Sequence, residues 1–191
     1  MTLWTVPLLP CSQGTSRRCL NRAKQDNSKQ IHIMEETYKL KSIGSVLIEG
    51  DKYSIRIKEE FKEGLAGIDG FSHLHIIWWG HLCDNDESRT RLKMGRLFKN
   101  GPDEIGVFGT HAPMRPNPVM TTTIKVLEID HDNGIIYTLF IDAENGTPVL
   151  DIKPYRMMER VRDCRTPGWA SHWPVWYEEA ADYDWDREIN R

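Results

Sequence analysis

The fold of this chain is constrained most by a series of short strand patterns that are separated by turn residues rather than by helices. Seven segments either alternate apolar with polar residues or are apolar throughout: 39–48, 52–57, 72–79, 105–110, 121–129, 135–141 and 149–152. Turn signals stand at 49–51 and 130–134, and 59–68 is a short helical or turn-rich stretch. Strands joined by short connections predict a mainly β fold, a compact antiparallel β-barrel or closed sheet with short helical segments.

The same pattern argues against the common nucleotide-binding fold. The strands do not alternate with helices, and no Gly-x-Gly-x-x-Gly follows a strand. Gly64, Gly67 and Gly70 are spaced by three residues, which is not that fingerprint. No Gly-x-Ser-x-Gly is present either, so nothing favours acyl-enzyme chemistry.

Composition divides the 191 residues into three parts. We expect a tail over 1–33, a functional barrel domain over 34–158 and a Trp-rich acidic extension over 159–191. The tail is open to three interpretations: a disordered segment, a transit peptide, or upstream sequence from a misassigned start, which Met34 favours. Four scattered cysteines and no apolar run long enough for a bilayer predict a cytoplasmic protein without a membrane partner.

Charge is distributed unevenly along the chain. The net charge is −3, but residues 1–33 carry five basic side chains against one acid, so the remainder stands at −7. A net negative charge over residues 34–191 is not typical of a protein that binds nucleic acid over its whole surface, and we expect no DNA partner. Segment 89–99 holds five basic residues and no acid, on a loop between strands. It is either a solvated basic loop or a phosphate-contact site, in which the candidate RNA-binding residues are Arg89, Arg91, Lys93 and Arg96.

The most informative motif is 106–118, which contains Arg115-Pro116-Asn117-Pro118. Arg115 and Asn117 each precede a proline, so both are restricted to extended geometry and each proline fixes its own φ. The motif therefore presents two polar side chains on a backbone with little freedom, which suits a polar ligand. A proline-rich surface loop is the plain alternative.

A second polar cluster follows at Asp151, Lys153 and Tyr155. If the strand continues to Tyr155, alternation places all three on one face. They are either a surface ion pair or, with Arg115 and Asn117, a pocket able to hold a zwitterion.

Two further features have alternative interpretations. His73 and His75 share a strand face and are followed by His81 and Cys83, a possible zinc set; a histidine bonded in a polar pocket is the preferred interpretation, and we expect no metal. Trp169, Trp173, Trp176 and Trp185 are expected to pack back on the barrel or across a subunit contact, rather than to stack on bases.

Three linked motifs, at 64–74, 106–118 and 142–155, closely resemble the TsaA-like/TrmO family in sequence, order and spacing, and the likeness runs from about Tyr38 to Tyr155. The resemblance implies a small β-barrel that binds S-adenosylmethionine and works as a homodimer. It also implies methylation of the N6 nitrogen of threonylcarbamoyladenosine at position 37 of tRNA, next to the anticodon.

In those terms the candidate catalytic residues are His73, Arg115, Asn117 and Asp151, and the candidate cofactor-binding residues are Arg115, Pro116, Asn117, Asp151, Lys153 and Tyr155. Arg115 would bind a carboxylate and Asn117 an adenine edge. Asp151 would face the sulfonium or accept a proton, and His73 would orient the acceptor or act as base.

The chain departs from the family pattern beside this motif. Thr110-His111-Ala112 stands where the family commonly has Thr-Arg-Ser, and Val119-Met120 where it has Ile-Gly. Two alternatives to the tRNA methyltransferase therefore stay open. One is a methyltransferase of the same fold with a non-tRNA acceptor, and the other is a non-catalytic ligand-binding or metal-binding module.

Overall fold

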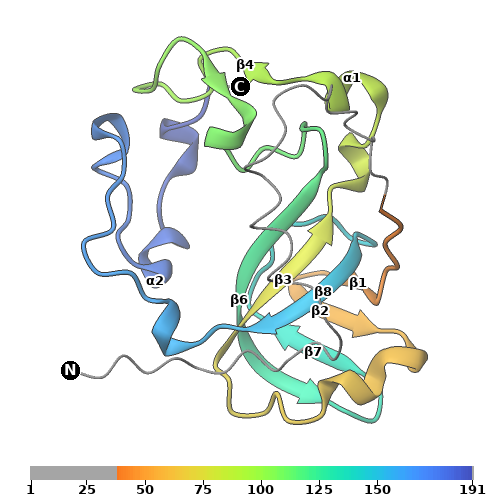
Figure 1. Ribbon diagram of the computed structural model, residues 1–191. Coiled ribbons are helices and arrows are strands. Elements are labelled where there is room, and N and C mark those ends of the chain that lie inside the picture. The colour runs from red at the N-terminus through yellow and green to blue at the C-terminus, as the bar shows by residue number, and fades with distance from the viewer. Residues whose placement is uncertain (1–37, 191) are drawn as a thin grey trace, which may run out of the picture. The chain divides into compact units, whose positions relative to one another are not determined.

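Six strands close into an antiparallel barrel in the computed structural model, which describes residues 38–190 (Figure 1). They are β1 (Gly44–Glu49), β2 (Lys52–Ile57), β3 (His73–Trp79), β6 (Val119–Asp130), β7 (Ile135–Thr138) and β8 (Pro148–Pro154). The order around the barrel is β1-β2-β7-β6-β3-β8, and pairing of β1 with β8 closes it. The predicted antiparallel barrel is confirmed. The interpretations of 1–33 lie outside the described residues.

The barrel is filled by the inward side of each strand's alternation. On β3, Leu74, Ile76 and Trp78 are buried while the residues between them face outward. The indole N–H of Trp78 donates to Thr122 Oγ1 at 3.0 Å, so this large side chain is buried with its polar group satisfied. The buried core comprises Val46, Ile55, Ile57, Leu65, Leu74, Ile76, Trp78, Met120, Ile124, Ile136, Ile141 and Val149.

The turns follow the predicted signals. Gly50, between β1 and β2, has φ 62°, and Gly134, between β6 and β7, has φ 64°. Glycine takes this left-handed conformation without steric cost, which is why both hairpins turn there. The 3-10 helix η1 (Glu59–Leu65) occupies most of the predicted helical stretch and buries Leu65 in the core.

Two sequence predictions about the region between β3 and β6 were wrong. Only Ile105–Gly106 of the expected strand 105–110 is extended: it forms β5, which pairs with β4 (Lys93–Met94) in a separate two-stranded sheet, and the chain then turns through η3 (Val107–Gly109). The basic segment is not an open loop, because α1 (Asp86–Thr90) and β4 run into it, after η2 (His81–Cys83). At 107–110 turn bonds override strand propensity, and at the basic segment the side chain of Asn85 accepts from the amide of Ser88 and begins a helix where a loop was expected.

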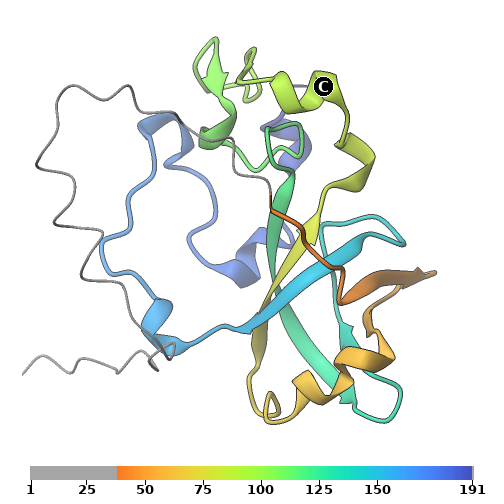
Figure 2. The ribbon, with the colours of Figure 1, turned by 45° about the vertical axis from the view of Figure 1, so that its right-hand side comes forward.

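The tryptophan-rich extension packs on its own chain through Trp169, Trp173 and Trp185, whose rings contact Phe98 or one another rather than the barrel strands. Trp176, which was expected to pack as well, is 63% exposed. The extension contains η4 (Met157–Glu159), η5 (Gly168–Ala170), α2 (Tyr177–Ala180) and η6 (Trp185–Arg187) (Figure 2). The rings of Trp169 and Trp173 each lie 5.0 Å from Phe98, in the segment after β4, and Ile189 forms a β-bridge with Phe98. None of the helices in the described part of the chain combines the length and apolarity that crossing a membrane requires.

Glu188 links three side chains of this extension through hydrogen bonds. Its buried carboxylate accepts hydrogen bonds from His172 Nε2 at 2.9 Å, Trp173 Nε1 at 3.1 Å and Tyr183 Oη at 2.9 Å. The bond from His172, more than the other two, holds the pKa of the Glu188 carboxyl below its ordinary value of 4.5. A group with a depressed pKa in the folded state stabilises the fold only while it is ionised.

Glu188→Gln should therefore lower the thermal unfolding midpoint at pH 7, because an amide cannot accept all three bonds. The stabilisation by Glu188 is present above about pH 4.5 and is lost as the pH falls through the lower folded-state pKa. We expect the difference between wild type and variant, measured by calorimetry from pH 7 to pH 3, to shrink at the acid end. Glu178→Gln, at an exposed position of the same extension, is the matched control. A difference that does not change with pH would contradict this role.

Candidate functional site

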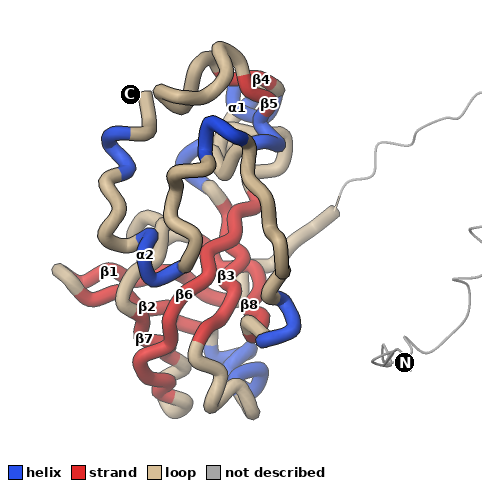
Figure 3. Tube along the Cα trace, turned by 90° about the vertical axis from the view of Figure 1, so that its left-hand side faces the viewer, coloured by secondary structure: helices blue, strands red, loops and turns tan. Residues whose placement is uncertain are grey.

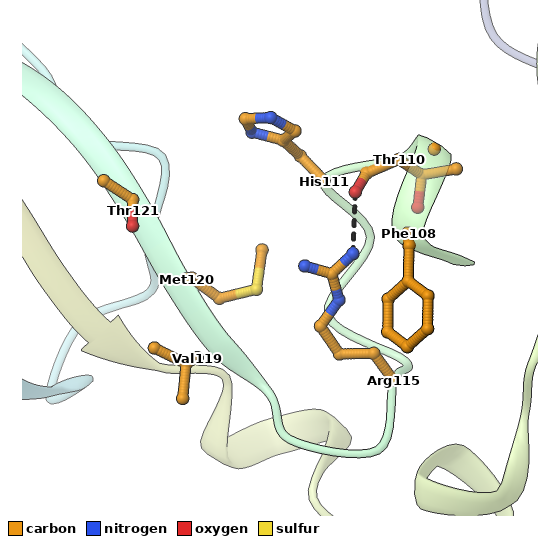
Figure 4. Close-up of a pocket in the computed structure, with 8 residues that line it drawn as sticks. Phe108, Thr110, His111, Arg115, Val119, Met120 and Thr121 are labelled. Carbon is orange, nitrogen blue, oxygen red and sulfur yellow. Dashed lines mark hydrogen bonds between the residues drawn. The ribbon is translucent and has the colours of Figure 1, made fainter. Parts of the chain in front are cut away.

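A tight turn between β5 and β6 is held closed by its own backbone and by one arginine. Val107 and Thr110 are buried, and both the amide and the hydroxyl of Thr110 donate to the carbonyl oxygen of Val107, at 3.1 and 2.9 Å. Arg115 Nη2 donates to that oxygen at 2.6 Å and to the carbonyl oxygen of Thr110 at 2.7 Å (Figure 4). A guanidinium donating to two backbone carbonyls fixes the turn more firmly than neutral bonds would.

Arg115 also has an unsatisfied donor. Its Nε is buried and has no hydrogen-bond partner within the described part of the chain. A buried donor without an acceptor costs about 1–3 kcal/mol, and charged groups cost more. Such a group is expected where a ligand brings the missing acceptor.

The turn and the start of β6 enclose a pocket beside Arg115. Its volume is about 440 Å³, within the range of small-molecule sites. The ring of Phe108 lies at this pocket and is 83% exposed, because Val107 takes the inward position in the turn. The lining residues are Phe108, Gly109, Thr110, His111, Arg115, Val119, Met120 and Thr121 (Figure 4). An exposed aromatic face, hydroxyl groups and an arginine suit a ligand with a flat ring and an anionic group.

The neighbours of Arg115 in the motif do not line this pocket. The carbonyl oxygen of Pro116 accepts from Arg89 Nη1 at 3.3 Å. The side chain of Asn117 is exposed, and its carbonyl oxygen accepts from the amide of Val119 at 2.7 Å. Arg115 and Asn117 are thus adjacent in sequence but do not face one cavity.

The second predicted cluster lies on the outer face of the barrel. In the sheet register His75 pairs with Lys153 and Ile77 with Asp151, and Lys153 Nζ donates to Asp151 Oδ2 at 2.5 Å. The ring of Tyr155 lies 5.2 Å from that of His75. Asp151, Lys153 and Tyr155 therefore gather with the histidines of β3.

This outer face adjoins the pocket without entering it. Ile77 pairs with Asp151 on one side and with Thr121, a pocket residue, on the other. Two strand spacings, about 10 Å, separate Asp151 from Thr121. His73 lies four residues before Ile77, about 13 Å along the strand. The structure therefore brings only Arg115, among the predicted catalytic and cofactor-binding residues, to the pocket.

The two histidines of β3 differ in their surroundings. Both ring nitrogens of His75 are engaged, Nδ1 with Thr123 Oγ1 at 3.0 Å and Nε2 with Glu159 Oε2 at 2.7 Å. The bond from His75, ahead of one from Arg156, lowers the pKa of the Glu159 carboxyl. His73 bonds only through Nδ1, to Ser72 Oγ at 2.9 Å, so its Nε2 has no partner among residues 38–190. His73 therefore keeps a ring nitrogen available to a ligand, whereas His75 does not.

Tyr177 of α2 reaches His73 from the extension, with ring centroids 5.3 Å apart. Burial raises the pKa of the Tyr177 phenol. The extension thus contributes a side chain to the outer face of the barrel, next to β6 and β3 (Figure 3).

The histidines and the cysteine that were considered as zinc ligands do not form a metal site within the described residues. No group of three or more His, Cys, Asp and Glu side chains within 38–190 is arranged to hold a metal ion. His75 instead bonds to Thr123 and Glu159, while His81 and Cys83 lie in η2.

The four predicted RNA-binding side chains are each paired with an acid. Arg89 bonds to Asp84 at 2.5 Å, Arg91 to Glu87 at 2.9 Å and Lys93 to Glu104 at 2.8 Å, and Arg96 pairs with Asp103. The bonds from Arg89 and then Trp79 lower the pKa of the Asp84 carboxyl. Residues 84–104 hold five basic and five acidic side chains, so their net charge is zero. RNA contact by this segment stays a prediction, and it would have to compete with these pairs.

Most of the residues that line the pocket were not predicted from the sequence to be site residues. Phe108 lies inside the 106–118 motif, but an apolar residue between Val107 and Gly109 gives no indication that its ring is exposed. Met120 and Thr121 were counted only as strand residues. The signal that was available is His111, which stands out in the motif and does line the pocket.

Comparisons with known proteins agree with this architecture. A probable S-adenosyl-L-methionine-binding protein from Pyrococcus horikoshii is 38% identical over 118 residues, which cover 62% of this chain and 82% of that protein. A human tRNA (adenine(37)-N6)-methyltransferase is 38% identical over 100 residues, which cover 52% of this chain but 22% of the human protein. The solved structure of TrmO from P. aeruginosa matches the fold with a TM-score of 0.54 at 23% identity, covering 71% of this chain and 62% of that one.

The family comparison extends over most of the chain. The model of the tRNA-methyltransferase O N-terminal domain matches residues 41–159, which take in all six barrel strands, the turn at 107–110 and Arg115. The extension after residue 159 lies outside the match. The chain belongs to the family of the tRNA-methyltransferase O N-terminal domain.

Proposed function

We propose that this chain transfers the methyl group of S-adenosylmethionine to the N6 nitrogen of threonylcarbamoyladenosine at position 37 of tRNA. Membership of the tRNA-methyltransferase O family supports a methyltransferase that uses S-adenosylmethionine, as do relatives named for binding that cofactor. The identity of the methyl acceptor is the more specific part of the proposal. It is supported by the name of the human relative, of which this chain spans 22%.

The observation that carries the proposal is Arg115, which lines the pocket and whose buried Nε has no hydrogen-bond partner among the described residues. The carboxylate of a methionine moiety is an anionic acceptor of the kind that a buried guanidinium N–H lacks. The exposed ring of Phe108 offers a stacking face for the adenine. The residues present therefore fit the cofactor.

When bound, S-adenosylmethionine supplies an electrophilic methyl carbon on a sulfonium. Transfer of that carbon would be an in-line displacement, in which the residues of the site would align the acceptor nitrogen and take up its proton. Positioning provides most of the catalysis in such an in-line displacement, so a rigid turn at 107–110 is useful. His111 lines the pocket and is the histidine within reach of that nitrogen. His73 lies about 13 Å along β3 from Ile77, so it would take part only in orienting a larger substrate along the outer face.

We retain Asn117, Asp151, Lys153 and Tyr155 as proposed ligand contacts at the rim of this region. The side chain of Asn117 is exposed, and the other three lie on the outer face of the barrel, where a substrate larger than the cofactor would rest. Asp151 and Lys153 already neutralise each other, so together they suit a polar neutral group better than a phosphate.

We also propose that two copies of the chain associate, as the resemblance implies. Leu127, in β6, and Leu139 and Phe140, directly after β7, are each more than half exposed. A homodimer would bury apolar surface of this kind. A tRNA substrate accords with the cytoplasmic location predicted from the sequence.

A methyltransferase with a different acceptor is the second candidate function. The neutral charge of residues 84–104 favours it, because the segment expected to contact phosphates carries no excess of positive charge.

The test of the acceptor is methyl transfer from labelled S-adenosylmethionine to total tRNA, with and without the threonylcarbamoyl group, followed by mass spectrometry of the nucleosides. We expect methylated product from the modified tRNA alone. Cofactor binding without product on either tRNA would contradict the tRNA acceptor and favour the second candidate.

Arg115→Lys should weaken binding of S-adenosylmethionine by about ten- to a hundredfold, as judged from about 1.5–3 kcal/mol for a hydrogen bond to a charged group. A lysine keeps the charge but cannot bond two carbonyls and a carboxylate together. Isothermal titration calorimetry would measure the change. Arg56→Lys, on β2 and outside the pocket, is the matched control. Equal affinity of the Arg115→Lys variant and wild type would rule out this role of Arg115.

A further inference from the structure

A segment rich in arginine leaves the outer face of the barrel directly after β8. This arginine segment, residues 156–165, holds four arginines against Glu159 and Asp163, a net charge of +2. Its start is fixed to β3, because Glu159 accepts from both His75 and Arg156. From there the chain leaves the end of β8 and runs away from the barrel strands toward η5 (Figure 1). The charge therefore begins at the edge of the face that carries His73, His75 and Tyr155.

The arginines beyond the anchor are free. Arg160, Arg162 and Arg165 are exposed, and their side chains make no ion pair or hydrogen bond with any residue in 38–190. A turn at Arg162–Asp163, where Asp163 has φ 55°, separates two of them from the third. Aspartate is one of the few residues that adopt this conformation readily, so the turn is a defined feature of the segment.

The contrast with residues 84–104 is what makes this segment informative. There every one of Arg89, Arg91, Lys93 and Arg96 bonds to a carboxylate. A phosphate that approaches them meets acids at the same distance as the cations, whereas the three free arginines offer uncompensated charge. Guanidinium groups also bind phosphate oxygens in a bidentate manner.

The apolar side chains of the segment suit the same partner. Met157 is 78% exposed and Val161 is 74% exposed. An unstacked nucleotide presents sugar and base surface alongside its phosphate, so alternating arginine and apolar side chains match single-stranded or loop RNA better than a duplex.

We propose that the arginine segment, through Arg160, Arg162 and Arg165, is the surface on which this chain binds the phosphate backbone of its RNA. The inference rests on the proposed function and deepens it, since it assigns the RNA contact to a region after β8 instead of the region before η3. The arginine segment begins at the end of β8 that lies beside His73 and His75, and the other end of β3 adjoins the pocket at Thr121.

The test compares two triple variants that each remove three positive charges: Arg160→Gln with Arg162→Gln and Arg165→Gln, against Arg89→Gln with Arg91→Gln and Arg96→Gln. Binding of total tRNA is measured by filter binding at several salt concentrations, and calorimetry checks folding. We expect the first triple to lose at least tenfold in affinity. The slope of log K against log salt should fall by about 2–3, because each lost phosphate contact removes about 0.7–0.9. The second triple should stay near wild type.

A third variant, in which Arg160, Arg162 and Arg165 are all replaced by lysine, should keep the salt slope because it keeps the charge. An unchanged affinity of the first glutamine triple, or an equal loss in both glutamine triples, would overturn the inference. If the lysine triple loses as much tRNA affinity as the first glutamine triple, a contact that depends on charge alone is likewise excluded. Methyl transfer by the wild type tests the proposed function separately. If tRNA binds through the arginine segment but no methylated product forms, the proposed acceptor is wrong, while the assignment of the RNA-binding surface is retained.

Discussion

The site of this protein depends on the bonds that Arg115 makes to the carbonyl oxygens of Val107 and Thr110. They convert a stretch with strand propensity into a tight turn, with Val107 directed inward and Phe108 outward. The pocket exists because of that turn. The same guanidinium leaves Nε without an acceptor, so the group that builds the pocket also specifies an anion for it. One residue thus links the local fold to the proposed binding of a methionine carboxylate.

The extension beyond the family match is tied to the barrel region through separate contacts. Glu188 accepts hydrogen bonds from three donors, and Phe98 packs against two tryptophans, one stacked and one edge-on, so residues 166–190 form a small cluster together with Phe98. From this cluster Tyr177 reaches His73. Between β8 and the cluster lies the arginine segment, held at its start by Glu159. The extension therefore adds charge and an aromatic ring to a face that the family domain alone would leave more open.

The barrel was predictable from sequence because period-two alternation and glycine turns are local signals. The turn at 107–110 was not, since its cause is a long side chain eight residues further on that bonds backward to the backbone. The basic segment was misjudged for a related reason. Its acids lie on both sides of it in sequence, at Asp84, Glu87, Asp103 and Glu104, and only folding brings them to the cations. Arg115 was correctly predicted to hold a restricted, polar position. The part of its pocket that lies on β6, Val119 to Thr121, could not be assigned from the chain order.

The central claim is that the cofactor binds between the turn at 107–110 and the start of β6. A crystal structure of the full chain with S-adenosylhomocysteine, the product of methyl transfer, tests it most directly. The account predicts ligand density beside Phe108, His111 and Thr121, with a carboxylate oxygen within hydrogen-bond distance of Arg115 Nε. Density on the outer face around Asp151 and Lys153, with the pocket at Arg115 empty, would contradict it.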